Sequence, residues 1–492
     1  MLRYAGKKEG AMAYRFGNRE QLGLLPASIE DYVSQEDPVR VYDVFVESLN
    51  FAELGIELDE EQVGSPEYDP KAMMKLLVYG YSYGVKGSRK LERECHHNLS
   101  FMWLMGGLKP DHKTIAEYRR RHKKGLTKVL KQCVRLCIKL DLIAGNVLFV
   151  DGTKIRANAG RGKTHGREWY DKQLKEIDHR IEEVIAQSEK IDQHEASQGS
   201  SVKIDKELAQ AERLKKTIAK ALKTMEESGL EKINLTDPDC AIMHSVQGSH
   251  ASYNVQSVVD DKHGLMVQVE AVNDTSDVNQ FGRQIDQANQ NLEEPCKVGC
   301  ADAGYADTEE LKKIDKQGIE VVVPSQRQAL HNQEDKPFSK SHFRYDKEKD
   351  CYVCPAGKEL GYVGRDHKNG KRDYRISMAG ICQSCEHWGR CTTAKLGRKI
   401  VRLALEEDKQ RFESQYEACK EIYDRRKSRA EHPFGYIKRN LKTDSFMLRG
   451  QDGVQAESSL LATCFDLRRM MTLVGITGLI DKLRAIAMPA LA

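Results

Sequence analysis

The stretch LFVDGTKIRANA, residues 148–159, places a carboxylate directly after a short apolar run. Leu148 to Val150 are enough for a buried strand. Asp151-Gly152 follows, and then the cations Lys154 and Arg156. A carboxylate at the end of a buried strand, beside cations, suits the holding of a divalent metal ion against a phosphate. The alternative is an Asp-Gly turn that closes a hairpin; two later acidic motifs favour the first interpretation.

Composition indicates a globular protein of two to four domains, because the chain has 492 residues, of which 40% are hydrophobic and 31% charged. The net charge of +4, from 78 basic and 74 acidic residues, does not by itself indicate a polyanionic partner. The N-terminal MLRYAGKKEG lacks the apolar core of a signal peptide, and no run is long enough to span a bilayer. We therefore expect a soluble, cytoplasmic protein whose 13 cysteines are reduced thiols or metal ligands.

Residues 1–145 are predicted to be mostly helical. Asp69-Pro70 begins one helix, Gly87-Ser88 precedes a second, and Pro110-Asp111 precedes a third. Basic side chains at the density found in the third helix can neutralise phosphates and release counterions, so this helix is predicted to contact DNA. The alternative is an ordinary solvated helix face. The basic residues are Arg119, Arg120, Arg121, His122, Lys123, Lys124, Lys128 and Lys131.

The hydrophobic period changes along the rest of the chain. Residues 146–151 are predicted to form a strand. Over 165–230, apolar residues recur every three or four positions, which predicts an inserted helical hairpin or short coiled coil. From residue 250 a period of two predicts a β-hairpin, followed by a helix near 277–292 and strands in CKVGCADAGY and IEVVVPS. This region is therefore mixed α/β. Helices are expected again at about 403–426, at 433–440 and over SSLLATCFDLRRMMTLVG.

Two further acids fit the pattern set by Asp151. Asp302 ends the strand in CKVGCADAGY, and Glu431 lies in the strongly basic YDRRKSRAEHPFGYIKRN. Glu431 by itself is more simply a salt-bridged helix residue, but the combination of three acids is more specific than any one of them. Asp274 and Asp277 are alternative acids, and Asp277 is more simply a helix cap.

The blocks LFVDGTKIRANA, ADAGY and RRKSRAEHPFGYIKR resemble the three catalytic blocks of bacterial insertion-sequence DDE transposases, most closely the insertion-sequence 1182 group. The resemblance covers nearly the whole chain and implies a ribonuclease-H-like core. Asp151, Asp302 and Glu431 would then form the metal-binding triad. Related enzymes carry a Tyr-Arg-Glu-Lys signature with gaps of two, three and six residues. Tyr423, Arg426, Glu431 and Lys438 match it except that four residues, not three, separate Arg426 from Glu431.

The resemblance also implies a domain plan. It consists of a helical N-terminal DNA-binding domain (1–145), a catalytic core (146–335 and 395–480) with the helical-hairpin insertion (165–230), a cysteine-rich insertion (336–394) and a tail (481–492).

By the same resemblance, the chain would bind the terminal inverted repeats of its insertion sequence and catalyse strand cleavage and strand transfer. Two Mg²⁺ or Mn²⁺ ions per active site suit in-line displacement at phosphorus and an all-carboxylate site. Lys438 would contact the reacting phosphate, and Lys154, Arg156, Tyr423 and Arg426 would contact DNA. Such enzymes generally act as dimers on paired ends. The alternatives are a DNA-binding regulator or domesticated derivative without chemistry, and a metal-dependent nuclease without strand transfer.

Five cysteines lie between residues 351 and 391, and paired Cys-x2-Cys spacings predict a structural zinc site with four thiolates. Family resemblance favours Cys354, Cys382, Cys385 and Cys391 as ligands. Simple ribbon spacing favours Cys351 in place of Cys391. The alternative is a set of free thiols.

Overall fold

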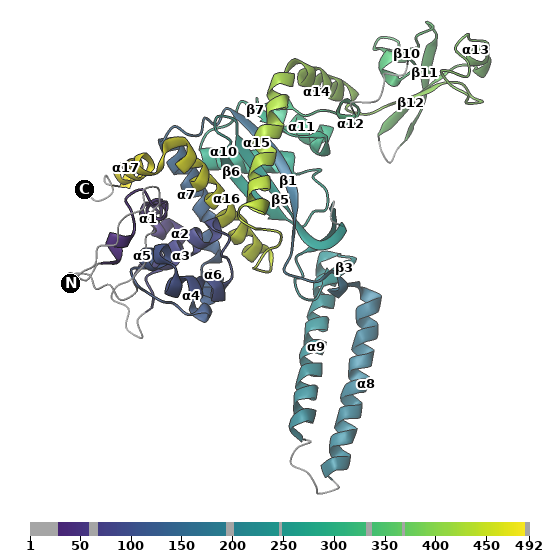
Figure 1. Ribbon diagram of the computed structural model, residues 1–492. Helices are drawn as coiled ribbons and strands as arrows, with labels where there is room; N and C mark the ends of the chain where they lie inside the picture. The colour runs from purple at the N-terminus through teal and green to yellow at the C-terminus, as the bar shows by residue number, and fades with distance from the viewer. Residues whose placement is uncertain are drawn as a thin grey trace, which may run out of the picture.

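The computed structural model describes residues 28–58, 67–192, 201–245, 248–330, 337–366 and 370–487. Figure 1 shows a body of helices around one mixed sheet, from which a long helical hairpin and a small second sheet extend in different directions. Every helix within the described ranges is too short or too polar to traverse a bilayer.

The N-terminal region is helical, as predicted. Asp69 accepts hydrogen bonds from the backbone N–H groups of Lys71 and Ala72, and Pro70 occupies the first position of its helix. The predicted third helix is instead two helices, which meet at His122. The elements here are η1 (Ile29–Tyr32), α1 (Val39–Glu47), α2 (Phe51–Leu54), α3 (Pro70–Ser82), α4 (Ser88–His97), α5 (Leu99–Leu104), α6 (His112–Arg121) and α7 (Lys123–Lys139).

The main sheet is built around β1 (Val147–Arg156). On one side β1 pairs antiparallel with β5 (Gly248–Asp260), and on the other it pairs parallel with β7 (Val298–Cys300). β5 also pairs antiparallel with β4 (Ala241–Ser245) and with β6 (Met266–Val272), which forms the predicted hairpin; β7 pairs parallel with β8 (Glu320–Val322). The described sheet is therefore mixed, as expected for an α/β protein.

The prediction that the first strand ends at Asp151 was wrong. β1 continues to Arg156 because residues 151–156 pair in register with Ser257 to Ser252 of β5. Asp151-Gly152 is therefore in the interior of a strand and not in a hairpin turn.

The helices after the sheet differ from prediction in their boundaries. The expected helix over 403–426 is divided between α14 (Glu406–Ala418) and α15 (Lys420–Arg439), and α15 runs without interruption through Pro433. Burial of Ala430, Pro433 and Phe434 holds α15 together despite the proline. The other helices of this part are α10 (Phe281–Leu292), η3 (Ala303–Tyr305), α11 (Thr308–Asp315), α12 (Gln326–Ala329), α16 (Gln451–Val474) and α17 (Ile476–Ala487).

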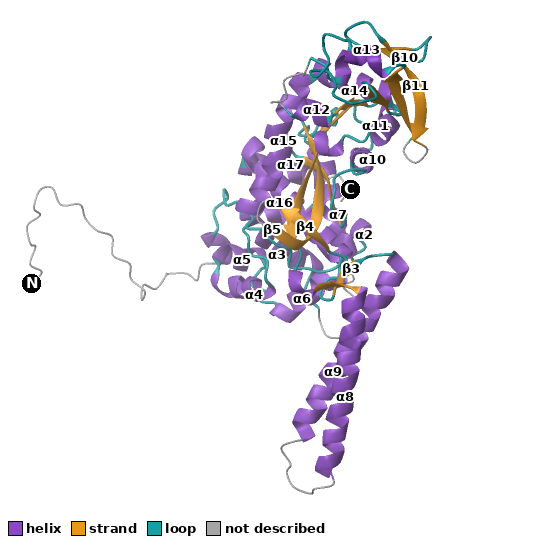
Figure 2. Ribbon diagram, turned by 90° about the vertical axis from the view of Figure 1, so that its right-hand side faces the viewer, coloured by secondary structure: helices purple, strands orange, loops and turns teal. Residues whose placement is uncertain are grey.

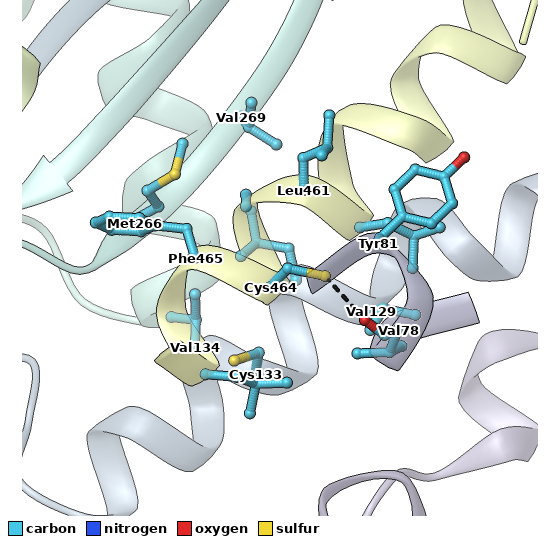
Figure 3. Close-up of a cluster of buried hydrophobic side chains, with 14 of the residues drawn as sticks. Val78, Tyr81, Val129, Cys133, Val134, Met266, Val269, Leu461, Cys464 and Phe465 are labelled. Carbon is cyan, nitrogen blue, oxygen red and sulfur yellow. Dashed lines mark hydrogen bonds between the residues drawn. The ribbon is translucent and has the colours of Figure 1, made fainter. Parts of the chain in front are cut away.

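The core of the body surrounds α16, which is buried over most of its length. Figure 3 shows side chains of α3, α7 and β6 packed around Leu461, Cys464 and Phe465 of this helix. The Sγ of Cys464 donates to the carbonyl of Val78 at 3.3 Å. This packing joins the N-terminal helices to the sheet. α17 contacts α1 and contains most of the segment that was expected to be a tail.

The predicted helical hairpin is confirmed. α8 (Arg167–Asp192) and α9 (Ser201–Ser228) lie side by side and point away from the body in both views (Figures 1 and 2). Its base has η2 (Arg161–Lys163), the two strands β2 (Thr164–Gly166) and β3 (Lys232–Asn234), and a small core of its own. That core contains Tyr170, Ile218, Ala221, Met225 and Ile233. Residues 193–200, which include most of the predicted polar break, lie outside the described residues.

The cysteine-rich segment contains an antiparallel sheet that the sequence pattern did not predict. Its strand order is β13-β12-β11-β10-β9, and it lies at the far end of the molecule from the helical hairpin (Figure 1). The elements are η4 (Lys340–His342), β9 (Arg344–Asp346), β10 (Cys351–Val353), β11 (Glu359–Asp366), β12 (Lys371–Ile376), α13 (Ala379–Gln383) and β13 (Lys399–Arg402).

Candidate active site

Three elements bring the predicted acids to one region of the sheet. Asp151 is on β1, Asp302 follows β7 and caps η3 through a 2.7 Å bond from the N–H of Gly304, and Glu431 is on α15. α15 packs across β1, β5 and β7. The parallel β1–β7 pairing brings the segments that carry Asp151 and Asp302 side by side, and the crossing helix adds Glu431.

The pKa of Asp151 reflects its burial and the charged groups around it. Burial is the largest cause that raises the pKa of Asp151 to about 6; the Arg426 guanidinium opposes the rise, and the negative charges of Asp302 and Glu431 add to it. Asp151 is therefore a carboxyl group removed from water and close to two other acids.

Arg426 lies between two of the acids. Its NH1 is 3.7 Å from Asp151 Oδ1 and its NH2 is 3.5 Å from Glu431 Oε1. The Arg426 side chain is 12% exposed, whereas that of Glu431 is 47% exposed. Its guanidinium is also 5.6 Å from the ring centre of Tyr423. One cation thus compensates part of the negative charge of this region.

Lys438 approaches the same face of β1 from the last turn of α15. Its Nζ donates to Thr153 Oγ1 at 2.5 Å, and Thr153 is two residues beyond Asp151. Side chains two residues apart on a strand point to the same face. Burial lowers the pKa of Lys438, and the charge of Asp151 opposes the decrease. Lys438 therefore lies on the same face of β1 as Asp151, and its predicted role at a phosphate stays a prediction.

The opposite face of β1 carries a second polar group. Lys154 Nζ is 3.5 Å from Asp277 Oδ1, which also accepts hydrogen bonds from Asn254 Nδ2 at 2.8 Å and from Gln256 Nε2 at 2.9 Å. The prediction that Asp277 caps a helix was wrong, because α10 begins at Phe281 after Gln280. Asp274 accepts from Gln280 Nε2 at 2.7 Å instead of joining this group.

Sequence reasoning missed Asn254, Gln256 and Tyr305. The signal that could have identified them is in β5, where fully buried Asn254 and Gln256 alternate with buried Tyr253 and Val255. Buried amide side chains need hydrogen-bond partners, and polar residues in a strand buried on both faces therefore mark an internal network.

The basic residues predicted to contact DNA fall into two groups. Arg119 is 4% exposed, and its guanidinium donates to the carbonyl of Lys86 at 2.8 Å and to Tyr81 OH at 3.4 Å. The prediction for Arg119 does not fit this position, because its side chain is used inside the fold. Arg120 and Arg121 are on the surface, where they pair with Glu117 and Glu67. Lys123 and Lys124 begin α7, and Arg156 ends β1.

Four of the five clustered cysteines line one small cavity, namely Cys354, Cys382, Cys385 and Cys391. Burial raises the pKa of Cys391, and the other three thiols raise it further, so the four groups are near one another. The N–H of Lys358 donates to Cys354 Sγ at 3.3 Å, and that of Arg398 donates to Cys382 Sγ at 3.5 Å. Cys351 is buried in β10 and does not line the cavity.

Within the described ranges, no three His, Cys, Asp or Glu side chains are grouped so that they could hold a metal ion in their present arrangement. For the acids, the physical reason is visible, because Arg426 lies between Asp151 and Glu431.

Two segments of the chain match protein-family models. Residues 27–121 match a model described as "Transposase domain (DUF772)", and residues 353–471 match one described as "Transposase DDE domain". Both models describe transposases, and the second describes a DDE domain, so these two parts of the chain are similar to transposase domains. The second match includes Glu431, Lys438 and the four cysteines of the cavity.

Among solved structures, the chain is similar to a piggyBac transposase in a synaptic complex with hairpin DNA. The identity is 9%, the match covers 92% of this chain and 80% of the other, and the TM-score is 0.33. No curated protein matches this chain.

Proposed function

We propose that this chain is a transposase that binds the terminal inverted repeats of its insertion sequence and catalyses metal-dependent DNA cleavage and strand transfer. The observation that carries the proposal is the gathering of Asp151, Asp302 and Glu431, from three distant segments, around Arg426. The sequence features shared with the insertion-sequence 1182 group support the same reaction.

The topology of the main sheet supports a ribonuclease-H-like core. The antiparallel run β6-β5-β1 continues on the other side of β1 with the parallel strands β7 and β8. The acids lie on the central strand, after its parallel neighbour and on a crossing helix.

The donor set fits a divalent cation of the Mg²⁺ or Mn²⁺ kind, because such ions prefer hard carboxylate oxygens. The raised pKa of Asp151 also indicates a buried carboxylate that a further positive charge would stabilise. Asp151, Asp302 and Glu431 would hold the metal, which requires Arg426 to leave its position between two of them. When bound, the metal would act as a Lewis acid that stabilises the negative charge on the attacking and leaving oxygens of a phosphodiester.

The cations beside the acids would bind the DNA phosphate. Lys438 is held next to Asp151 by Thr153, and an ammonium group there acts as a point charge on a phosphate oxygen. Once displaced from the acids, the Arg426 guanidinium can bind phosphate oxygens in a bidentate manner. Lys154, Arg156 and Tyr423 are further DNA contacts in this proposal.

Duplex binding away from the acids would use the basic residues where α6 meets α7, of which Arg120, Arg121 and Lys124 are exposed and Lys123 is half-buried. Arg120, Arg121, Lys123 and Lys124 remain in the proposed DNA surface, and Arg119 is removed from it because it is buried. We infer that two copies of the chain act on paired ends.

The cysteine cavity would hold a structural zinc ion. Four thiols around one cavity match the usual zinc donor set, and two backbone N–H groups already donate to sulfur, which favours the thiolate form. A site with four thiolates has no open position for a substrate, so its role is to stabilise the small sheet.

A second candidate is a DNA-binding regulator with this fold and no chemistry, which the position of Arg426 between Asp151 and Glu431 favours. The test is cleavage of a short duplex that carries the element ends, with Mg²⁺ and with EDTA. Mg²⁺-dependent nicking and joined products support the transposition chemistry. Binding without cleavage supports the regulator, and cleavage without joining indicates a nuclease.

A further inference from the structure

The ladder between β1 and β7 stops before the two aspartates. Its last pair is Phe149 with Cys300, and Asp151 and Asp302 each lie two residues further along their segments. After β7 the chain turns into η3, so no backbone hydrogen bond of this ladder sets the separation of the two carboxylates. Another contact must therefore set the separation of the Asp151 and Asp302 carboxylates.

Gln256 connects the two segments. It pairs in register with Gly152, the residue after Asp151, and its Oε1 accepts a 2.5 Å hydrogen bond from the hydroxyl of Tyr305. Tyr305 is the last residue of η3, the short helix that Asp302 caps. Gln256 and Tyr305 are 0% and 1% exposed, so water does not compete with this bond.

Gly152 allows these groups to approach. A Cβ built on Gly152 would lie 2.5 Å from Gln256 Nε2, 2.9 Å from Asp277 Oδ1 and 3.0 Å from Tyr305 OH. Any larger residue would therefore displace at least one of them. The glycine beside Asp151 is needed for close packing inside a strand and not for a turn.

Asp277 sets the orientation of the Gln256 amide. The NH₂ of Gln256 donates to Asp277 Oδ1 at 2.9 Å, which leaves the Gln256 carbonyl to accept from the Tyr305 hydroxyl. Asn254 donates to the same carboxylate oxygen and holds it in place. Burial and the nearby acids raise the pKa of Tyr305, so its hydroxyl remains a donor.

We propose that Gln256 is a positioning residue which, through Tyr305, sets the separation of Asp151 and Asp302; this rests on the proposed role of these aspartates as metal ligands. Asp277 completes the clamp by orienting Gln256. Neither Gln256 nor Tyr305 contacts metal or DNA in this role. Their effect is to preorganise two ligands that come from separate strands.

The test compares Tyr305→Phe with Tyr253→Phe in the full chain. Both tyrosines are buried, and both donate one hydrogen bond, Tyr253 to Asp237 Oδ1 at 2.8 Å. Mn²⁺ binding to the metal-free protein is measured by electron paramagnetic resonance, end binding by fluorescence anisotropy without metal, and stability by thermal unfolding. The Mn²⁺ site that is present in the wild-type protein and lost in Asp151→Asn is taken as the site at the acids. Gln256→Met, which removes both ends of the clamp at similar volume, is the second variant.

We expect Tyr305→Phe and Gln256→Met to weaken Mn²⁺ binding by about 10- to 100-fold, the usual cost of changing a residue behind a metal ligand. Tyr253→Phe should lose similar stability and keep the wild-type Mn²⁺ affinity, and all three variants should bind ends normally. Equal Mn²⁺ affinity in Tyr305→Phe and Tyr253→Phe would overturn the positioning role alone. If the wild-type protein has no Mn²⁺ site that Asp151→Asn removes, the proposed function fails and the positioning role with it.

Discussion

Single side chains set the charge balance of the candidate active site. Asp151 is buried close to two other acids, and an uncompensated charge of this kind is costly. Arg426 compensates it from 3.7 Å, while Lys438 lies on the same face of β1. In the proposed function, metal entry would therefore exchange the positive charge of Arg426 for that of the metal ion.

Asp151→Asn and Asp302→Asn should each remove DNA cleavage but leave end binding unchanged, because a neutral amide is a poor metal ligand. The loss of cleavage activity should exceed the roughly 10- to 100-fold decrease that is usual when a residue supporting a metal ligand is changed. Asp274→Asn is the matched control, since Asp274 is a nearby acid engaged by Gln280. Gel-based cleavage and anisotropy measure the two effects. Normal cleavage by either triad variant would contradict the assignment.

Two neighbouring arginines should behave differently. Arg119→Met should lower the free energy of unfolding by about 1–3 kcal/mol, because it leaves buried acceptors at Lys86 and Tyr81 without their donor. It should not change the salt dependence of DNA binding. Arg120→Gln should leave stability unchanged and reduce the salt slope by about 1 for each lost phosphate contact.

Urea unfolding and binding isotherms at several salt concentrations separate these effects. A reduced salt slope in a stably folded Arg119→Met would show that this side chain reaches DNA. An unchanged slope in Arg120→Gln would place the DNA surface elsewhere.

At the scale of elements, β1 and α15 decide which side chains meet. β1 extends past Asp151, so Asp151 and Thr153 face α15, while Gly152 and Lys154 face Asp277. α15 continues through Pro433, so Glu431 and Lys438 stay about two turns apart on one helix face. A break at the proline would separate them.

The small cysteine sheet gives an element-scale prediction. Cys385→Ser should abolish binding of about one zinc ion per chain, because four thiolates are needed for a closed site. Cys351→Ser should keep the zinc, since Cys351 is in β10 and does not line the cavity. Atomic absorption of the purified variants measures the zinc content. Loss of zinc in Cys351→Ser with retention in Cys391→Ser would favour the alternative ligand set.

The buried helix α16 predicts a pH dependence of stability. Asp466 is fully buried, accepts the N–H of Met266 at 2.8 Å, and has a pKa raised well above its ordinary value by burial. The folded protein therefore holds a proton that the unfolded chain releases above about pH 4, so this contribution to stability is lost as pH rises toward the folded pKa.

Asp466→Asn keeps the acceptor for Met266 and cannot ionise. Relative to this variant, the wild-type protein should lose stability with increasing pH. Urea unfolding across the pH range measures the difference. Parallel pH profiles for the two proteins would contradict the prediction.

At the scale of the whole molecule, two parts extend from the body. The helical hairpin and the cysteine sheet point in different directions (Figures 1 and 2), whereas α16 joins the N-terminal helices to the main sheet. The hairpin has its own core around Tyr170, and α8 and α9 make their main contacts with each other, β2 and β3.

Shortening the hairpin should therefore leave the body intact. Removal of residues 182–213, with a short Gly-Ser connection, keeps the basal core and the 2.5 Å ion pair between Asp178 and Lys215. The main unfolding transition in calorimetry should be unchanged, because the removed turns lie away from α16 and the sheet. A lower transition temperature would show that the distal hairpin supports the body.

The sequence by itself determined several elements of this protein and its candidate acids. Apolar periodicity predicted the helical hairpin and the β5–β6 pair, and short motifs marked Asp151, Asp302 and Glu431. These are local signals, readable from residues close together in the chain.

The tertiary structure alone decided which side chains meet. Arg426 lies between Asp151 and Glu431, Arg119 is buried and donates to the carbonyl of Lys86, and Gln256 connects Gly152 to Tyr305. Each of these outcomes depends on strand register or on burial by segments distant in the chain. Local patterns carry no information on either, because register and burial arise only when the whole core packs.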